Sequence, residues 1–533
     1  MASTAATGPQ PESGAAAAAS APLDDVATLP VRNALLVVIG VMTASLLQVL
    51  DTTIANVAIP HMQASLGATS DEVSWVLTSY IVASAVGIPT TGWLSDRIGS
   101  RRLFILSTAG FVVSSMLCGM AQNITQMVLF RALQGLSGSF ISPLSQAAML
   151  DINRPSRQAQ MMAIWGMGIM VGPILGPIIG GWLTENWNWR WVFYVNVPLG
   201  ILALAILIAE LPSRPIRRRR FDLFGFAMIA TAITSLQLML DRGNHVDWFE
   251  STEVWIYAIT MICATWMGAV HFLTTKGETL FTGSLFANRN FVVALVFMLV
   301  MGMVMFASMA LMPSMLQRLM GYSVIGTGWV MMPRGVGTLL SMQLSGILVR
   351  KGVDSRAIVI LGFLLAGASF WQMSNWSLGV DQYHIVTSGF IQGLGIGLLF
   401  IPVNTTAFAT LTPELRTEGS SLLNLSRSLG ASIGIAITTA LLARNIQSSH
   451  SDLASHVTAS MTGVIDFSTI DRFQQLGTTA LSVVDAEINR QAAMVAYIDN
   501  YYLMMWLSIL AIPLAFLMKK AATTNVIKGD IPH

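Results

Sequence analysis

Long apolar runs recur along most of the chain and are separated by short polar segments. A run of about 20 apolar residues is long enough to cross the hydrocarbon core of a membrane as an α-helix. The pattern predicts fourteen such helices, at 34–57, 72–95, 102–121, 124–150, 160–183, 190–211, 223–242, 252–274, 290–317, 324–349, 356–373, 384–411, 418–443 and 498–518. The chain is therefore predicted to be an all-α polytopic membrane protein.

The composition agrees with this prediction. Of the 533 residues, 54% are hydrophobic and 11% are charged, and the mean hydropathy is +0.64. A soluble domain carries about 25% charged residues, so an ordinary cytoplasmic enzyme is excluded. The net charge of +2 is too small to indicate nucleic-acid binding. Because Cys118 and Cys263 both lie in apolar runs, we expect neither a disulfide framework nor a cysteine metal site.

Lys and Arg residues concentrate in alternate loops. If both termini are cytoplasmic, twenty of the 29 basic residues lie on the inner side and six on the outer side, and Arg131, Arg334 and Arg427 lie within spans. This bias favours cytoplasmic termini. Residues 1–33 are predicted to be a disordered cytoplasmic tail, and 519–533 a second tail. The first apolar run is long enough to span, so no cleavable signal is expected.

Two motifs recur in the second half of the chain. Gln134 and Gln392 each precede a glycine and are 258 residues apart, and Gly92 and Gly346 begin similar motifs 254 residues apart. Such repetition predicts two six-helix bundles, at 34–211 and 290–518, with a linker and an inserted helix pair at 212–289. Repeated halves that enclose a midplane site are typical of transporters. The long outer loop at 444–497 mixes apolar and polar residues, which predicts short amphipathic helices.

An acidic residue lies within the first apolar run. Asp51 is flanked by a polar stripe in which Gln48, Thr52 and Asn56 follow one another every four residues. A charge in hydrocarbon costs roughly 2.5–3.5 kcal/mol on insertion scales, so such a residue usually faces a cavity or a partner. We interpret Asp51 as a candidate proton carrier. The alternative is a structural acid that pairs within the bundle.

The fourth predicted helix carries an arginine beside small residues. Arg131 shares a helix face with Gly135 and Gly138, where another helix can approach closely. Arginine stays protonated, but its charge can bias a neighbouring acid. A role in proton coupling and a buried structural ion pair are equally compatible with this pattern.

The fifth predicted helix has a smooth glycine face. Glycines recur every fourth residue at Gly168, Gly172, Gly176 and Gly180, and Pro173 and Pro177 lie between them. The glycines predict a groove for close helix packing, and each proline removes a backbone donor and should bend the helix. We interpret this helix as a pivot or seal between the halves.

A short motif joins the second and third helices. It contains Gly92, Asp96, Arg97 and Gly99, followed by Arg101 and Arg102. Gly99 permits a tight turn, and Asp96 can pair with a cation or a helix N-terminus. The preference for positive charge on the inner side of the membrane explains the arginines, but it explains neither Asp96 nor the glycines.

Flexible and polar side chains in the helices are candidates for a substrate cavity. Methionines at 298, 301, 305, 309 and 312 form one helical stripe that suits ligands of varied shape. A core or lipid-facing stripe fits the same spacing. The candidate cavity residues are Gln48, Asn56, Gln134, Met301, Met305, Met309, Asn424 and Arg427. The sequence has no nucleotide-binding loop, zinc-protease helix or hydrolase elbow, so we expect no enzyme, no metal and no cofactor besides a coupling proton.

These motifs resemble those of a known family. LDTTIANVAIP at 50–60, GWLSDRIGSRR at 92–102, RALQG at 131–135 and GPILGPIIGG at 172–181 are similar to motifs of the fourteen-helix drug:proton antiporters of the major facilitator superfamily, in the EmrB/QacA branch. The resemblance is greatest to the EmrB group and covers nearly the whole chain after the tail. Ser100 stands where the family usually has a basic residue, and we expect Arg101 and Arg102 to compensate.

The resemblance implies a major facilitator fold and a function. It implies proton coupling at Asp51 and Arg131, gating at the 92–99 loop and antiporter packing at Gly172–Gly180. It further implies proton-driven efflux of hydrophobic or amphipathic compounds across a bacterial inner membrane, and antibiotic resistance. Expected partners are membrane lipid, a periplasmic membrane-fusion adaptor that contacts the outer loop and an outer-membrane channel. The alternatives are a dedicated exporter of one metabolite or siderophore and a non-transporting sensor or scaffold.

Overall fold

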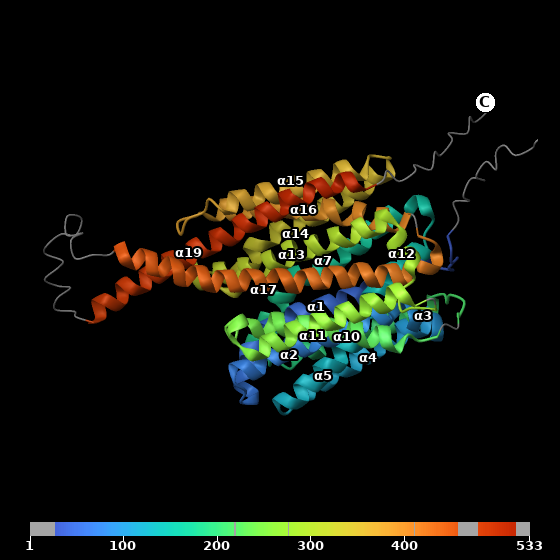
Figure 1. Cartoon of the computed structure of the whole chain (residues 1–533), viewed down its shortest axis with the longest axis horizontal. Helices are drawn as coiled ribbons and strands as arrows, with labels where there is room; N and C mark the ends of the chain where they lie inside the picture. The colour runs from blue at the N-terminus through green and yellow to red at the C-terminus, as the bar shows by residue number, and fades with distance from the viewer. Residues whose placement is uncertain (1–26, 218–219, 276, 410, 457–477, 519–533) are drawn as a thin grey trace, which may run out of the picture.

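The computed structural model describes residues 27–217, 220–275, 277–409, 411–456 and 478–518. In this part of the chain every regular element is helical. The helices run side by side along the long axis of the molecule, and those of the C-terminal half occupy the upper part of the view (Figure 1). The fold therefore agrees with the predicted all-α class.

The N-terminal half contains most of the helices that form the candidate site. They are α1 (Ala34–Leu66), α2 (Ser70–Gly87), α3 (Thr91–Ile98), α4 (Ser100–Met120), α5 (Ile124–Gly138), α6 (Ile141–Asp151), α7 (Pro155–Asn186), α8 (Trp191–Tyr194) and α9 (Asn196–Glu210). Helix α1 packs against α6, α7 and α9, which places it in the interior of this half.

An inserted pair and a C-terminal half follow. The pair consists of α10 (Leu223–Gly243) and α11 (Thr252–Thr274), and the remaining helices are α12 (Gly283–Ala287), α13 (Arg289–Ser314), α14 (Val324–Arg350), α15 (Ser355–Met373), α16 (Gln382–Ala409), α17 (Arg416–His456) and α19 (Thr478–Ala511). Helix α16 packs against both α14 and α15. Helix α13 packs against α17. The main contact between the halves joins α7 to α14.

Twelve helices of the described residues are long and apolar enough to cross a membrane, so fourteen spans are not confirmed. The segment predicted at 124–150 divides into α5 and α6 because the helix breaks at residues 139–140. The segment predicted at 324–349 forms α14 but is rich in Gly, Ser and Thr, which lowers its hydropathy. Both segments lie where helices were predicted.

The outer loop differs from the prediction. Short amphipathic helices were expected at 444–497, but α17 continues to His456 and α19 begins at Thr478. The side chains of Asn445 and Asp499 are 3.0 Å apart and join the two helices. The polar residues in this stretch therefore lie on long paired helices, which extend past the other helices in Figure 1. Residues 457–477 lie outside the described part of the chain.

Candidate functional site

A buried ion pair joins α1 to α5. Oδ2 of Asp51 accepts a hydrogen bond from Nη1 of Arg131 at 2.7 Å, and both side chains have no exposed surface. Two charges withdrawn from water stabilise a fold only when hydrogen bonds satisfy their remaining polar atoms. The neighbours of the pair therefore determine what it can do.

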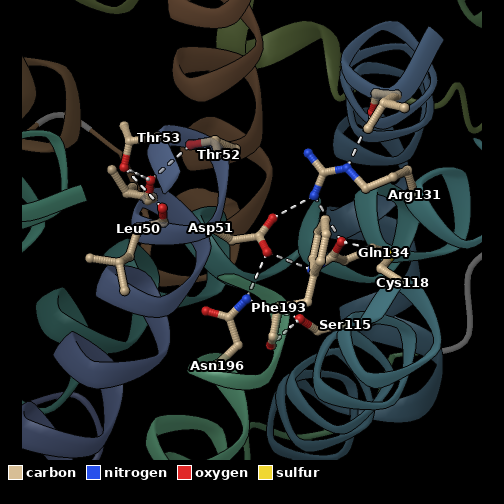
Figure 2. Close-up of polar contacts among 12 residues, drawn as sticks. Leu50, Asp51, Thr52, Thr53, Ser115, Cys118, Arg131, Gln134, Phe193 and Asn196 are labelled. Carbon is tan, nitrogen blue, oxygen red and sulfur yellow. Dashed lines mark hydrogen bonds and ion pairs between the residues drawn. The ribbon is translucent and has the colours of Figure 1, made fainter. Parts of the chain in front are cut away.

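Two amides complete the surroundings of the carboxylate. Oδ1 of Asp51 accepts from Nε2 of Gln134 at 2.8 Å and from Nδ2 of Asn196 at 2.7 Å (Figure 2). Asn196 is held in place because its Nδ2 also donates to the Ser115 hydroxyl at 3.0 Å. Helices α4, α5 and α9 thus supply hydrogen-bonding groups on this side of the cluster, and Asp51 receives three N–H donors.

Arg131 is held by further contacts on its other side. Its Nε donates to the Val76 carbonyl oxygen at 3.2 Å, and its Nη1 also donates to Oε1 of Gln134 at 2.8 Å. The guanidinium carbon lies 4.4 Å from the centroid of the Tyr80 ring, within range of a cation–π interaction. The cation is therefore fixed against α2, α5 and α1.

This arrangement matches the charged form of Asp51. Protonation would cancel the charge that Arg131 faces and turn one acceptor oxygen into a donor, which cannot point at an N–H group. Leaving the partner of a buried ion pair uncompensated costs about 3–5 kcal/mol. A proton at Asp51 would therefore disfavour this packing of α1 and α5.

The glycine face of α7 packs on the same turns of α1. A Cβ at Gly172 would lie 3.2 Å from the Leu50 nitrogen, and a Cβ at Gly176 would lie 2.1 Å from Oγ1 of Thr53. The backbones can approach this closely only because these positions lack a side chain. Asp51 lies between Leu50 and Thr53, so α7 contacts the turn that carries the acid. Pro173 and Pro177 are accommodated within one helix, α7.

The polar stripe of α1 continues on either side of Asp51. Oε1 of Gln48 accepts from the Ser142 hydroxyl at 3.0 Å, whereas Asn56 is exposed and forms no hydrogen bond with the cluster. The methionine stripe lies on α13, where Met301 and Met305 are buried and Met309 is half-buried. These methionines belong to the C-terminal half and lie apart from the ion pair.

The predicted cavity residue Asn424 joins the two halves. Its Nδ2 donates to Oε1 of Gln146 at 3.0 Å, and Ser420 donates to the same oxygen at 2.6 Å. Gln146 comes from α6 and also donates to Asn404 of α16. Arg427 donates to Oδ1 of Asn424 at 2.9 Å, so it extends this network within α17.

A second charged cluster lies at the end of the bundle where α6 ends and α17 begins, which we call the Asp151 cluster. Asp151 forms ion pairs with Arg214 and Arg416. Arg214 also donates to the Thr417 hydroxyl at 2.7 Å. Because Asp151 belongs to the first half and Arg416 and Thr417 to the second, the cluster joins the halves.

The 92–99 motif lies beside this cluster. It was expected to be a loop, but residues 91–98 form helix α3, and Gly99 follows the helix. A Cβ at Gly92 would be 3.1 Å from Cβ of Glu418 on α17, and Gly99 has φ +92°, a backbone conformation that favours glycine. The carbonyl oxygen of Asp96 accepts from the Arg217 nitrogen at 2.9 Å, and Arg97 lies 5.7 Å from the Trp93 ring centroid.

The expectation that Arg101 and Arg102 compensate for Ser100 stays a prediction, but the structure shows the contacts of these residues. Arg101 donates to the Ile208 carbonyl oxygen at 2.5 Å, and Arg102 is exposed. The Ser100 hydroxyl accepts instead from the backbone nitrogen of Arg214, whose guanidinium group reaches Asp151. The segment after α9 therefore contacts Ser100 through its backbone.

Sequence reasoning missed Asn196, Gln146 and Arg214. Asn196 interrupts an apolar run after Phe193, and that single polar position was the available signal. Gln146 is a similar interruption near the end of an apolar run. Arg214 lies in a basic segment where positive charge on the inner side of the membrane already explained its presence.

Comparisons with known proteins place the chain in a family. Residues 41–435 match the Major Facilitator Superfamily. The chain is 35% identical over 433 residues to "Multidrug export protein EmrB" of Escherichia coli (strain K12), which covers 80% of this chain and 84% of that protein. It is 32% identical over 502 residues to "Fatty acid resistance protein FarB" of Neisseria gonorrhoeae, with coverage of 92% and 97%.

A solved structure has a similar fold. The crystal structure of the human organic anion transporter MFSD10 superposes with a TM-score of 0.57 at 14% identity and covers 89% of this chain and 99% of that one. At this identity the likeness concerns the fold alone. The sequence matches, the helical fold and the buried charges between helices lead to one conclusion: the chain belongs to the Major Facilitator Superfamily.

Proposed function

We propose that the protein is a proton-driven exporter of hydrophobic and amphipathic compounds, seated in a bacterial inner membrane with both termini in the cytoplasm. The relative named "Multidrug export protein EmrB" supports the efflux direction and export of more than one drug. The observation that carries the proton coupling is the buried Asp51–Arg131 pair, whose acid lies within an apolar span and can be neutralised by a proton. The bias of basic residues supports the orientation.

The coupling follows from the contacts of Asp51. A proton that arrives from the outer side cancels the carboxylate charge and weakens its bonds to Arg131, Gln134 and Asn196. The turn of α1 is then free to move against the glycine face of α7. Because α7 also packs on α14, this motion changes the contact between the halves. One proton moving down 100 mV supplies about 2.3 kcal/mol.

The test is substrate-induced collapse of a pH gradient in inside-out vesicles. Hydrophobic cations, anions and neutral drugs are added to vesicles that contain equal amounts of the wild type, Asp51→Asn or Asp381→Asn. Asp381 is the matched control because it is an exposed acid outside the spans, where hydrogen bonds from His384 hold the pKa of its carboxyl below its usual range. We expect collapse with the wild type and with Asp381→Asn.

Three other outcomes would change this proposal. Collapse in all three samples would support antiport but would show that Asp51 takes no part in the proton coupling. Collapse with one compound only would indicate a dedicated exporter. Absence of collapse across the panel, with bound compounds detected by dialysis, would favour a sensor or scaffold.

We also propose that the paired helices α17 and α19 bind a periplasmic adaptor. Helix α17 has 41 residues, or roughly 60 Å at 1.5 Å per residue, which exceeds a hydrocarbon core of about 30 Å. Its excess length lies at the end opposite Arg416. His450 and Asp485, 2.9 Å apart, join the two helices in this extension. A rigid extension of this kind offers a surface to a partner outside the membrane.

Shortening the extension tests this proposal. Replacing 450–490 by a short Gly-Ser linker should leave gradient collapse in vesicles intact, because that assay needs no adaptor. Resistance of whole cells should fall to the level of cells that lack the protein. Unchanged resistance would show that the extension contacts no essential partner.

A further inference from the structure

Arg334 is a buried cation without an acidic partner among the described residues. It lies on α14, and 7% of the residue surface is exposed. Its Nη2 makes one long hydrogen bond, 3.4 Å to the Met305 carbonyl oxygen, and its Nη1 has no hydrogen-bond partner in the described part of the chain. The ion pairs in that part involve other basic residues.

The charge of this side chain cannot be removed by loss of a proton under physiological conditions. Tyr501 of α19 is near enough to Arg334 for an electrostatic interaction, but a phenol is neutral at neutral pH, and this phenol donates to the Met315 sulfur at 3.7 Å. An unpaired cation within the membrane is strongly disfavoured. Arg334 therefore has an unmet requirement for an anion.

The repeat of the two halves shows which group is missing. Helices α5 and α16 begin at Ile124 and Gln382, the same 258 residues apart as Gln134 and Gln392. Gln134 donates to Asp51 of α1, whereas Gln392 donates to the Ser308 hydroxyl of α13 at 3.0 Å. The second half thus has a serine where the first half has its acid.

The same offset relates Arg131 to Gly389. A Cβ at Gly389 would lie 3.6 Å from Cβ of Arg334, so the arginine of α14 lies beside the position that corresponds to Arg131. Among the described residues, the C-terminal half therefore has a buried cation and a buried glutamine, but no carboxylate that pairs with Arg334 as Asp51 pairs with Arg131.

The surroundings suit the apolar part of a ligand. Met305 of α13, whose carbonyl oxygen Arg334 reaches, is buried, and Val304 of α13 and Val330 of α14 share a buried apolar cluster. Gly335, the residue after Arg334, lies against Ile174 of α7, because its Cβ would be 2.1 Å from Cδ1 of Ile174. The contact between the halves thus passes beside Arg334, and separation of α7 from α14 would open a path to it.

We propose that Arg334 binds the carboxylate of amphipathic anionic substrates, which supply the acid that this half of the protein lacks. This inference rests on the proposed export function and specifies one substrate class for it. The carboxylate would accept hydrogen bonds from the guanidinium group in two-pronged geometry, and the hydrocarbon part would lie along the methionines of α13.

Equilibrium binding to the full-length protein in nanodiscs tests the site without transport. Decanoate and decanamide are the probes, because they share a hydrocarbon chain and differ in charge, and empty nanodiscs correct for partition into lipid. The variants are Arg334→Gln, Arg334→Lys and the control Arg318→Gln. Arg318 is an exposed arginine of the same half, so its removal alters the charge by the same amount.

We expect the wild type and Arg318→Gln to bind decanoate roughly tenfold to a hundredfold more tightly than decanamide, as for hydrogen bonds to a charged group. Arg334→Gln should bind both probes alike, and Arg334→Lys should keep part of the preference. Equal binding of the probes by the wild type, or a preference retained in Arg334→Gln, would overturn the proposal. If Arg334→Gln does not fold, the wild-type comparison and Arg334→Lys still decide.

Transport separates this inference from the proposed function. In proteoliposomes with a pH gradient, decanoate should be exported more efficiently than decanamide by the wild type. Binding with the expected preference but no transport of either probe would leave the site intact and refute proton-driven export. Transport of decanamide without preferential binding of decanoate would leave export intact and refute the anion site.

Discussion

Replacement of Gly176 by alanine should disturb the packing of α7 on α1 more than replacement of any neighbouring glycine in the same groove. The added Cβ would lie 2.1 Å from Oγ1 and 2.7 Å from Cβ of Thr53. Rotation of the Thr53 side chain moves the oxygen but not its Cβ, so the helices must separate. Overpacking of this kind costs about 1–3 kcal/mol of unfolding free energy.

Gly180 provides the matched comparison. A Cβ at Gly180 would approach its neighbours only to 3.2 Å, at Cγ2 of Ile54, which a small adjustment relieves. Gly180→Ala should therefore cost less than about 1 kcal/mol, since alanine also favours the helix. Gly283→Ala is a second control, because nothing lies within 4 Å of its added Cβ.

The assay is unfolding of the purified protein in mixed micelles with increasing denaturing detergent, paired with gradient collapse in vesicles. Thr53 is two residues from Asp51, so separation of the helices should also reduce proton-coupled transport by Gly176→Ala. Equal losses of stability for Gly176→Ala and Gly180→Ala would refute the reasoning. So would a stable Gly176→Ala with full transport.

Three further predictions concern other contacts. Asn196→Ala removes one donor from Asp51 and should lower the free energy of unfolding by about 1.5–3 kcal/mol, measured in the same titration, and an unchanged value would show that water replaces the amide. Arg214→Ala should loosen the Asp151 cluster and raise the labelling rate of a cysteine placed at Ser420 in a Cys263→Ser background; an unchanged rate would mean that Arg416 suffices. Thr78→Val removes the 2.6 Å hydrogen bond that joins α2 to Asp241 of α10. Proteolysis between α10 and α11 should increase, and equal proteolysis would show that apolar packing alone holds α10 and α11 on α2.

The sequence predicted those site residues whose chemistry conflicts with their surroundings. Asp51 and Arg131 are charges within apolar runs, so their burial requires a partner, and the structure brings them within 2.7 Å. The glycine spacing of α7 predicted close packing for the same kind of reason, because four missing side chains on one face leave a groove. Which helix occupies that groove depends on tertiary structure and could not be predicted from spacing.

Hydropathy alone could not predict the remaining features. It predicted one helix at 124–150, although the break between α5 and α6 lies beside Gly138 and shortly before Pro143, which has no backbone N–H to donate. The role of Gln146 depends on Asn404 and Asn424, which are more than 250 residues away in the sequence. Long-range hydrogen bonds of this kind follow from the assembly of the halves rather than from the residues beside them.

The inserted helices give the molecule two unlike flanks. Helix α10 packs on both α2 and α17, which belong to different halves, and Ile233 of α10 shares an apolar cluster with Ala85 and Leu425. On this flank the junction of the halves is covered by an extra layer of protein, whereas on the other flank α7 and α14 close it by direct contact. Movement of the halves relative to each other therefore has to break a direct helix–helix contact on one flank, and has to displace or carry along the inserted helices on the other.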